Sequence, residues 1–347
     1  MIPGVIADDM ALCRYTADKF WIACRCLAGH EERSVQEREG AAPTFGIRGK
    51  VKESQTSSDR EVMKLSVVIP CLNGAATIAD QLEALANQQW SQPWEVIFAD
   101  NGSTDESLAI ARRYQERIPN LRIVDASDRR GQPYALNAGV AAAKGEAVAL
   151  CDADDEVAPG WVAAMGDALS VHDFVACRID VEKLNPPWAR MRSGQTRGIQ
   201  KYRYPPYLPH AGGCSLGFKR GLHEAIGGFD ESLPYLHDTD FCWRLQLAGT
   251  ELHFVPEATV HVRQRHSRIG RYRQAFIWAE YSVLLHKRYQ PLGMPKLSLK
   301  QGLTSWKNLL WMLTHMRSTE DVTKCVWEVG WRLGRVRGSI KHRFLSL

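Results

Sequence analysis

The sequence predicts an α/β domain built on an open, mostly parallel sheet, followed by a helical extension. From Lys64 to about Asp155, short β-branched runs alternate with segments whose apolar residues recur at helical spacing. Polar clusters follow the ends of these runs, after Ile69, Ala99 and Cys151 among others. Because ligands bind beyond the carboxyl ends of the strands in such sheets, we expect a functional site there.

Four strands and three helices make up this alternation. The expected strands are 64–70 (KLSVVIP), 94–100 (WEVIFAD), 121–127 (LRIVDAS) and 146–155 (EAVALCDADD). The expected helices between them are 74–90, with Ile78, Leu82 and Leu85 on one face, 104–118, capped by Ser103 or Thr104, and 133–145, closed by Gly145. Strand and helix thus alternate as in a parallel sheet with crossover helices.

The downstream half shows a weaker pattern. A helix beginning near Pro159 and a strand at 172–181 come first, and 212–231 returns to strand and helix. Residues 237–249 predict a helix, and 251–265 predicts a pair of strands. Between these, residues 183–213 are rich in Pro, Arg, Gly and Tyr, which predicts a long functional or mobile loop.

The composition is that of an ordinary globular protein. Of the 347 residues, 45% are apolar and 24% are charged, which excludes wholesale disorder and fibrous classes. We find neither a stretch approaching 18 apolar residues nor a secretory signal. The nine cysteines are scattered without a CxxC pair, which indicates free thiols in a reducing compartment and hence a cytoplasmic location.

The chain divides into three predicted regions. Residues 1–62 have few aliphatic residues and no sustained period, so we expect a disordered or dispensable leader. Residues 63–265 form the α/β domain, and residues 266–347 form a basic helical extension. Residues 261–347 carry 17 Lys and Arg against 4 Asp and Glu, whereas the rest carries 27 against 35. The basic tail is therefore expected to meet phospholipid head groups, a nucleotide-linked substrate or nucleic acid.

Three carboxylates, Asp152, Asp154 and Asp155, follow the fourth expected strand. They could cap a helix N-terminus, where acidic groups favour the positive end of the dipole. They could also bind a hard divalent ion such as Mg²⁺ or Mn²⁺, which leaves coordination sites for phosphate oxygens. Since neither GxxxxGK[ST] nor GxGxxG follows a strand, a P-loop or a dinucleotide site is not expected.

At this point the chain resembles family 2 glycosyltransferases of the GT-A fold. The resemblance covers residues 65–265 and rests on four segments in order: SVVIPCLNGAATIADQLEAL, VIFADNGSTDESLAIA, RRGQPYALNAGVAAAKGEAVALCDADDEVAPGW and GFDESLPYLHDTDFCWRLQLAG. It implies an inverting, Mg²⁺- or Mn²⁺-dependent transfer of a sugar from a nucleotide sugar, such as a UDP-sugar, to the hydroxyl of a glycan or lipid-linked acceptor. It further implies a place in cell-surface glycan or glycolipid synthesis.

The resemblance also implies the roles of particular residues. The expected donor contacts are Pro70, Asn73, Asp100, Arg129, Asn137 and Asp152. Arg130 competes with Arg129 for its role, and Gly139 belongs to the same element as Asn137. Asp154 is expected to coordinate the metal, with Asp155 behind it. His261 could supply a late ligand to the metal or the diphosphate, although a lone histidine is more often structural.

Asp238 matches the position of the family's catalytic base. A base must remove the proton of the acceptor hydroxyl on the face of the sugar opposite the leaving group. The usual family pattern is Glu-Asp, and this chain has His237-Asp238, which puts the role of the first residue in doubt. Asp240 is an alternative base, and Arg244 could pair with an acid or contact phosphate. On a helix, Asp238 and Asp240 face different sides.

The C-terminal tail predicts an amphipathic basic helix. Its apolar stripe is Val322, Val326, Val329, Leu333, Val336 and Ile340. Basic residues and Trp327 and Trp331 surround the stripe. Such a helix suits peripheral contact with an anionic membrane, here at the inner face of the cell membrane. It could equally pack on the catalytic domain or form a dimer contact.

Three other functions compete with sugar transfer. A degenerate GT-A domain could bind sugars or partners without catalysis, but Asp154 and Asp238 are both present. Nucleic-acid binding has no supporting motif in the sequence. The tryptophans and the valine stripe of the C-terminal tail favour contact with a membrane surface or with the protein core, so we expect no nucleic-acid partner. A nucleotidyltransferase would need an early glycine-rich loop with a basic residue, which PCLNGAATIAD lacks.

Overall fold

The computed structural model describes residues 62–190, 198–203 and 206–346. From Met63 onward these residues belong to one compact unit. The predicted leader, residues 1–62, lies outside the described residues except for Val62. The division of the remainder at residue 265 stays a prediction.

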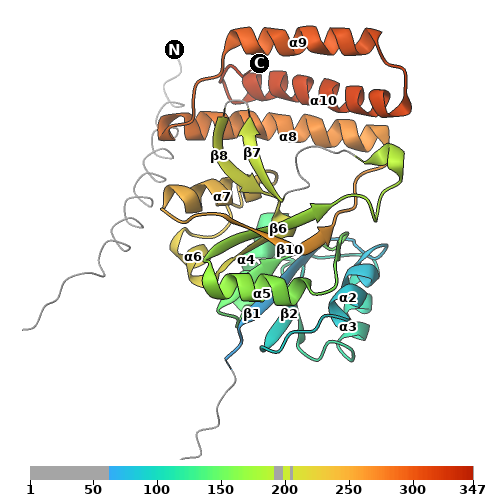
Figure 1. The fold of residues 1–347 in the computed structure, drawn as a ribbon, viewed down its shortest axis with the longest axis vertical. Helices are drawn as coiled ribbons and strands as arrows, with labels where there is room; N and C mark the ends of the chain where they lie inside the picture. The colour runs from blue at the N-terminus through green and yellow to red at the C-terminus, as the bar shows by residue number, and fades with distance from the viewer. Residues whose placement is uncertain (1–61, 191–197, 204–205, 347) are drawn as a thin grey trace, which may run out of the picture. The chain divides into compact units, whose positions relative to one another are not determined.

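An eight-stranded mixed sheet forms the centre of the domain, in the order β3-β2-β1-β4-β9-β6-β10-β5 (Figure 1). The strands are β1 (Leu65–Cys71), β2 (Trp94–Asp100), β3 (Leu121–Asp125), β4 (Ala147–Leu150), β5 (Glu156–Val157), β6 (Phe174–Asp180), β9 (Leu216–Lys219) and β10 (His253–His261). Neighbours among β3, β2, β1 and β4 are parallel, as are β6 and β10. Strand β9 runs antiparallel between β4 and β6, and β5 runs antiparallel to β10. The predicted α/β class with a mostly parallel sheet is confirmed.

Helices cover both faces of the sheet. They are α2 (Ile78–Ala86), α3 (Ser107–Tyr114), α4 (Gln132–Ala142), α5 (Trp161–Val171), α6 (Arg220–Ala225) and α7 (His237–Leu247). Side chains alternate along β1, so Val67 and Ile69 pack in one core with α2, α3 and α5, while Val68 packs in the other with α4 and α7. This two-sided burial explains why the strand is continuously apolar in sequence.

Three long helices follow the sheet: α8 (Arg268–Tyr289), α9 (Leu299–Thr314) and α10 (Thr319–Lys341). Figure 1 shows α10 between α8 and α9. Helix α10 packs closely on α8 through Gly330, Gly334 and Gly338, and a Cβ at Gly334 would lie 2.0 Å from the carbonyl oxygen of Phe276. No described helix is long and apolar enough to cross a membrane.

The predicted apolar stripe of α10 is therefore not its most tightly packed face. Within the stripe Leu333 and Ile340 remain 40% and 75% exposed, whereas the three glycines are buried. Close approach of two helices requires small residues, which a search for apolar spacing does not register.

Two predictions for the downstream half are wrong. Residues 251–265 form a single strand, β10, rather than a pair, and its register shifts between Val255 and Thr259. Pro256 lies at the shift and cannot donate a ladder hydrogen bond, so the strand bulges there instead of ending.

The second correction concerns residues 183–213. Part of this expected loop is a hairpin, β7 (Ile199–Arg203) with β8 (Pro206–Ala211), in a separate two-stranded sheet. Proline is unusual in strands, and Pro206 and Pro209 hide the second strand from a sequence pattern.

Candidate active site

A cleft of about 2020 Å³ opens beyond the carboxyl end of β4. Of the residues predicted for the site, six line it: Pro70, Asn73, Asp152, Asp154, Asp155 and Asp238. The ends of β1 and β4 form one side of the cleft, and the N-terminus of α7 supplies Asp238. The cleft therefore lies where ligands bind in open α/β sheets.

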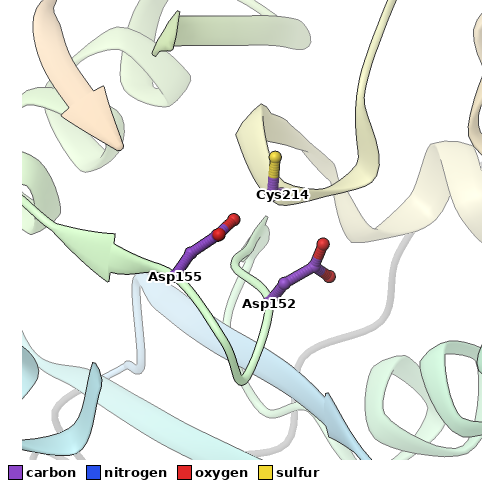
Figure 2. A group of neighbouring side chains, drawn as sticks. All are labelled: Asp152, Asp155 and Cys214. Atoms are coloured by element: carbon purple, nitrogen blue, oxygen red, sulfur yellow. The ribbon is translucent and has the colours of Figure 1, made fainter. Parts of the chain in front are cut away.

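Two of the three carboxylates after β4 converge with a cysteine. Ligand atoms of Asp152, Asp155 and Cys214 lie within 4.8 Å of one another, and Figure 2 shows the three side chains close together. Asp155 is buried, and its Oδ1 accepts a hydrogen bond of 2.9 Å from the backbone N–H of Arg263. This bond holds Asp155 within the cluster, and its expected place behind the metal ligand stays a prediction.

Crowding of like charges changes the acidity of this cluster. Burial, together with the neighbouring Asp154 and Asp238, raises the pKa of Asp152 to about 7. A hydrogen bond from Gln132 acts in the opposite direction and lowers the pKa. Burial also raises the pKa of Asp155 well above its ordinary value, with Asp152 and Asp154 adding to the effect. Each carboxylate is therefore costly to ionise unless positive charge approaches it.

Asp154 is exposed and lines the cleft, whereas Asp155 is buried. Arg263 holds the turn that carries it, because its Nε donates to the carbonyl oxygen of Asp154 at 3.0 Å and its Nη2 donates to Asp80 at 3.0 Å. The side chain of Asp154 is left free to contact a ligand. Direct coordination of a metal by Asp154 stays a prediction that this geometry permits.

The donor set suits a hard divalent cation. Asp152 and Asp154 offer carboxylate oxygens to the cleft, and Mg²⁺ and Mn²⁺ prefer oxygen ligands. Burial, with Asp155 and Asp152, raises the pKa of Cys214 well above its ordinary value, so its thiol stays protonated and is a poor ligand. The residues present therefore fit Mg²⁺ or Mn²⁺ better than a thiophilic metal.

Asp238 is held in the cleft by backbone donors. Its Oδ2 accepts from the N–H of Gly213 at 3.0 Å, and its Oδ1 accepts from the N–H of Thr239 at 2.7 Å. Leu236, just before α7, adopts φ 59°, a left-handed conformation that costs a non-glycine residue roughly 1–3 kcal/mol. This turn brings His237 and Asp238 to the cleft.

Asp240, the alternative base, has a different role. It is buried, its Oδ2 accepts from Arg244 Nε at 2.7 Å, and its Oδ1 accepts from Tyr289 Oη at 2.8 Å. Arg244 also donates to the carbonyl oxygens of Ile226 and Gly228. Asp240 is thus engaged in a buried network that joins α7 to α8 and is absent from the described cleft lining.

His237, the residue before Asp238, is buried and lines the cleft. Its Nδ1 has no hydrogen-bond partner within the described residues. Burial lowers its pKa, although Asp238 and Asp240 oppose the effect. A neutral imidazole thus stands where the family pattern has a carboxylate.

Asn73 and Asp100 organise the loops after β1 and β2. Asn73 Oδ1 accepts from the N–H of Thr104 at 2.8 Å, and its own N–H donates to Ser103 Oγ at 3.0 Å. Asp100 accepts from the N–H of Ser103 at 3.2 Å and is not among the described residues that line the cleft. Their contact with a nucleotide stays a prediction.

Asn137 and Arg129 make structural contacts. Asn137 donates to the carbonyl of Phe229 at 2.9 Å, and its Oδ1 accepts from the N–H of Phe229 at 2.8 Å and faces His223 Nε2 at 3.0 Å. The exposed Arg129 pairs with Glu231. These contacts fasten α4 to the segment before α7, and the described cleft lining contains neither residue. Their roles at the donor stay predictions.

His261 ends β10 beside Asp180. Its Nδ1 lies 2.5 Å from Asp180 Oδ2, and the side chain is half-buried. The structure thus gives the imidazole a carboxylate partner and does not include it in the described cleft lining. Its assignment as a metal ligand stays a prediction.

Sequence reasoning missed three residues of the site. Gln132 donates to Asp152 Oδ1 at 3.0 Å from the start of α4. Asn101 donates to the carbonyls of Ala126 and Arg129 and accepts from Gly131, which shapes the loop before that helix. The third is Arg263, whose side chain holds the carbonyl of Asp154 and the carboxylate of Asp80. The position of Asn101 directly after an expected strand was the one local signal that could have identified it.

The comparisons with known proteins agree with this geometry. A family model described as glycosyl transferase family 2 matches residues 66–227. A dodecaprenyl-phosphate galacturonate synthase of Rhizobium johnstonii is 34% identical over 178 residues, 48% of this chain and 50% of that protein. An uncharacterised glycosyltransferase of Escherichia coli is 35% identical over 133 residues, 38% of this chain and 37% of that protein. The chain thus spans half or less of the length of these two relatives.

A solved structure shares the fold. A mannosyltransferase of Pyrobaculum calidifontis, determined with GDP-Man and Mn²⁺, aligns with a TM-score of 0.54 at 20% identity and covers 94% of this chain and 97% of its own. The mixed sheet with helices on both faces is the GT-A fold. Residues 66–227 therefore form a family 2 glycosyltransferase domain.

The link between α4 and the segment before α7 should be sensitive to acid. Burial, reinforced by Arg244, lowers the pKa of His223 to about 4, below its ordinary value. Between about pH 6.5 and 4 the unfolded chain binds the proton more readily, so the free energy of unfolding should fall as the pH falls. His223→Gln keeps a donor for Asn137 and removes the titration.

Chemical denaturation at several pH values measures this effect. The wild type should lose up to about 3 kcal/mol relative to His223→Gln between pH 6.5 and 4. A His315→Gln variant, which changes an exposed histidine after α9, controls for the substitution itself. Parallel curves for the wild type and His223→Gln would contradict the prediction.

Proposed function

We propose that this protein transfers a sugar from a nucleotide-diphosphate sugar to an acceptor hydroxyl, with inversion at the anomeric carbon. One observation carries the proposal: Asp152, Asp154 and Asp238 line a single cleft, although they come from two distant parts of the chain. The first two would face the donor diphosphate, and the third would face the acceptor. The family membership of the domain supports this arrangement.

Asp238 would act as the general base. Its two oxygens are held by backbone N–H groups of Gly213 and Thr239, so the carboxylate is oriented without a competing cation. It would accept the proton of the acceptor hydroxyl as the oxygen attacks the anomeric carbon, while the bond to the diphosphate breaks. This placement of a base opposite a leaving group is the geometry of a single displacement with inversion.

The donor side would hold the diphosphate through Asp154 and Asp152 and a shared Mg²⁺ or Mn²⁺. When bound, such an ion neutralises charge on the departing diphosphate. Gln132 orients Asp152, and Arg263 fixes the turn that bears Asp154. A catalytically inactive sugar-binding protein is the less favoured alternative, because Asp152, Asp154 and Asp238 are all present in the cleft.

Replacing the base should separate chemistry from binding. Asp238→Asn can still accept from Gly213, so the fold and donor affinity should persist, while turnover falls roughly 10²–10⁴-fold. Nucleotide release from a panel of UDP- and GDP-sugars with Mn²⁺ measures turnover, and thermal shift measures donor binding.

Asp240→Asn is the matched comparison two residues away. It breaks a buried ion pair with Arg244 and should lower stability by about 3–5 kcal/mol. If Asp238→Asn kept full turnover, the assignment of the base would be wrong.

Metal dependence can be tested without knowing the donor sugar. In the presence of UDP or GDP, saturating Mn²⁺ should raise the melting temperature of the wild type by about 2–4 °C. Asp154→Asn should abolish this increase because it removes an exposed ligand oxygen. Glu251→Gln, at a side chain that is 82% exposed outside the cleft, should behave as the wild type. An unchanged increase in Asp154→Asn would refute the ligand role.

We also propose that the protein contacts an anionic membrane surface through α9. This helix exposes Leu303, Leu310, Trp311 and Leu313, at 66%, 64%, 63% and 43%. Residues 281–319 contain six Lys and Arg and no Asp or Glu. Apolar groups in a stretch whose charged residues are all basic complement a bilayer with anionic head groups. The proposed contact is therefore on α9, whereas the sequence analysis placed it on the stripe of α10 as one of several possibilities.

Sedimentation with vesicles of equal phosphatidylglycerol and phosphatidylcholine at low salt tests this contact. Replacing Leu310 and Trp311 by Ser should weaken binding at least about tenfold, because both side chains would insert in the interface. Val171→Ser, at an exposed valine on α5, should have no effect. The idea fails if the intact protein stays in the supernatant or if the double variant binds equally well.

A further inference from the structure

The cleft is larger than a nucleotide sugar requires. Ligand sites for small molecules usually measure about 300–1,000 Å³, whereas this one measures about 2020 Å³. It extends from the carboxylates to the helices α8, α9 and α10, which lie beyond the part matched by the family model. We call this extension the helical arm of the cleft. The residues that line it include Gln274, Trp278, Gln301, Trp306, Trp327 and Trp331.

Four tryptophans from three helices line the helical arm. Trp327 and Trp331 are four residues apart on α10, with ring centroids 6.4 Å apart and planes 18° from parallel. Trp278 of α8 meets Trp327 edge-on, with centroids 5.8 Å apart. All four side chains, including Trp306 of α9, are half-buried, so part of each ring is open to the cleft.

The polar lining of the arm includes the charged residues Lys324, Glu328, Arg332 and Arg335 and the amides of Gln274 and Gln301. Arg332 pairs with Glu328 and donates to the carbonyl oxygen of Ser305 at 2.8 Å, which ties α10 to α9. By contrast, within the described residues no hydrogen bond engages the side-chain amide of Gln274 or Gln301. The contacts of Arg332 hold α10 against α9. The amides of Gln274 and Gln301 remain available to a ligand.

The composition of the lining distinguishes between two classes of acceptor. A long prenyl or acyl chain is buried best among aliphatic side chains, and among the described residues of α8, α9 and α10 that line the cleft, none is aliphatic. A sugar has apolar C–H faces and a rim of hydroxyls. Flat indole rings beside amide groups match both features, because aromatic faces pack on the C–H groups and amides bond the hydroxyls.

We infer that the helical arm binds a saccharide acceptor of two or more sugar units. The units that do not react would pack on Trp327, Trp331 and their neighbours, and the terminal hydroxyl would reach Asp238. The inference rests on the proposed function for the identity of the ligand as an acceptor. Saccharide binding by the arm can nevertheless be measured by itself.

A conservative pair of variants tests the aromatic contact. Full-length wild type is first applied to an array of defined oligosaccharides, and the affinity for the best-bound one is then measured by calorimetry. Trp327→Phe keeps an aromatic face and should bind within about threefold of the wild type. Trp327→Leu keeps apolar bulk only and should bind about tenfold more weakly, or about 1.4 kcal/mol. Gln301→Ala, a mild change on the surface of α9, should also weaken binding.

Thermal melting and UDP or GDP binding show that each variant is folded with its donor side intact. Wild-type protein that binds no oligosaccharide on the array would overturn the inference, as would equal affinity in Trp327→Leu. Preferential binding of polyprenyl phosphate in phosphatidylcholine vesicles would also overturn it. If saccharides bind through Trp327 but no nucleotide sugar is turned over, the proposed function fails and the saccharide site stands.

Discussion

Repulsion among the carboxylates after β4 is the constraint on which the arrangement of the site depends. Three acids within four residues, one of them buried, would disrupt the turn without compensating contacts. Gln132 donates to one, the backbone of Arg263 donates to another, and the side chain of Arg263 fastens the carbonyl between them. The pKa values of Asp152 and Asp155 stay raised despite these contacts, because burial and the neighbouring carboxylates outweigh them.

The helical arm of the cleft depends on a different constraint, the close packing of α10 on α8. Small residues at every fourth position let α10 lie against the backbone of α8, where any side chain would collide. This contact fixes the rotation of α10, and the rotation turns Trp327 and Trp331 toward the cleft. Asp152 and Asp154 thus come from the part of the chain that the family model matches, whereas Asp238 and the helices α8, α9 and α10 that line the rest of the cleft follow residue 227. The proposed saccharide in the helical arm is compatible with the proposed membrane contact through α9 if the sugar alone enters the cleft.

Much of the fold could be predicted because its signals are local. The parallel strands are largely apolar runs of four to nine residues, and Asp152, Asp154 and Asp238 stand at element ends where the fold class expects a site. The contacts of Asn137 with Phe229 and of His261 with Asp180 could not be predicted, since they join residues about 80–90 positions apart. Only tertiary packing decides whether such a polar side chain faces a ligand or a neighbouring loop.

The charges around Asp238 explain why a histidine, His237, can stand where the family pattern has a glutamate. Asp238 already contributes to the raised pKa of Asp152 across the cleft. A second carboxylate beside it would add negative charge to a site that is hard to ionise. Burial lowers the pKa of His237, so its imidazole is neutral and adds no such charge. The Nδ1 atom of His237 is buried and has no hydrogen-bond partner within the described residues. A histidine at this position therefore leaves Asp238, the proposed base, in place and avoids further repulsion between Asp238 and Asp152.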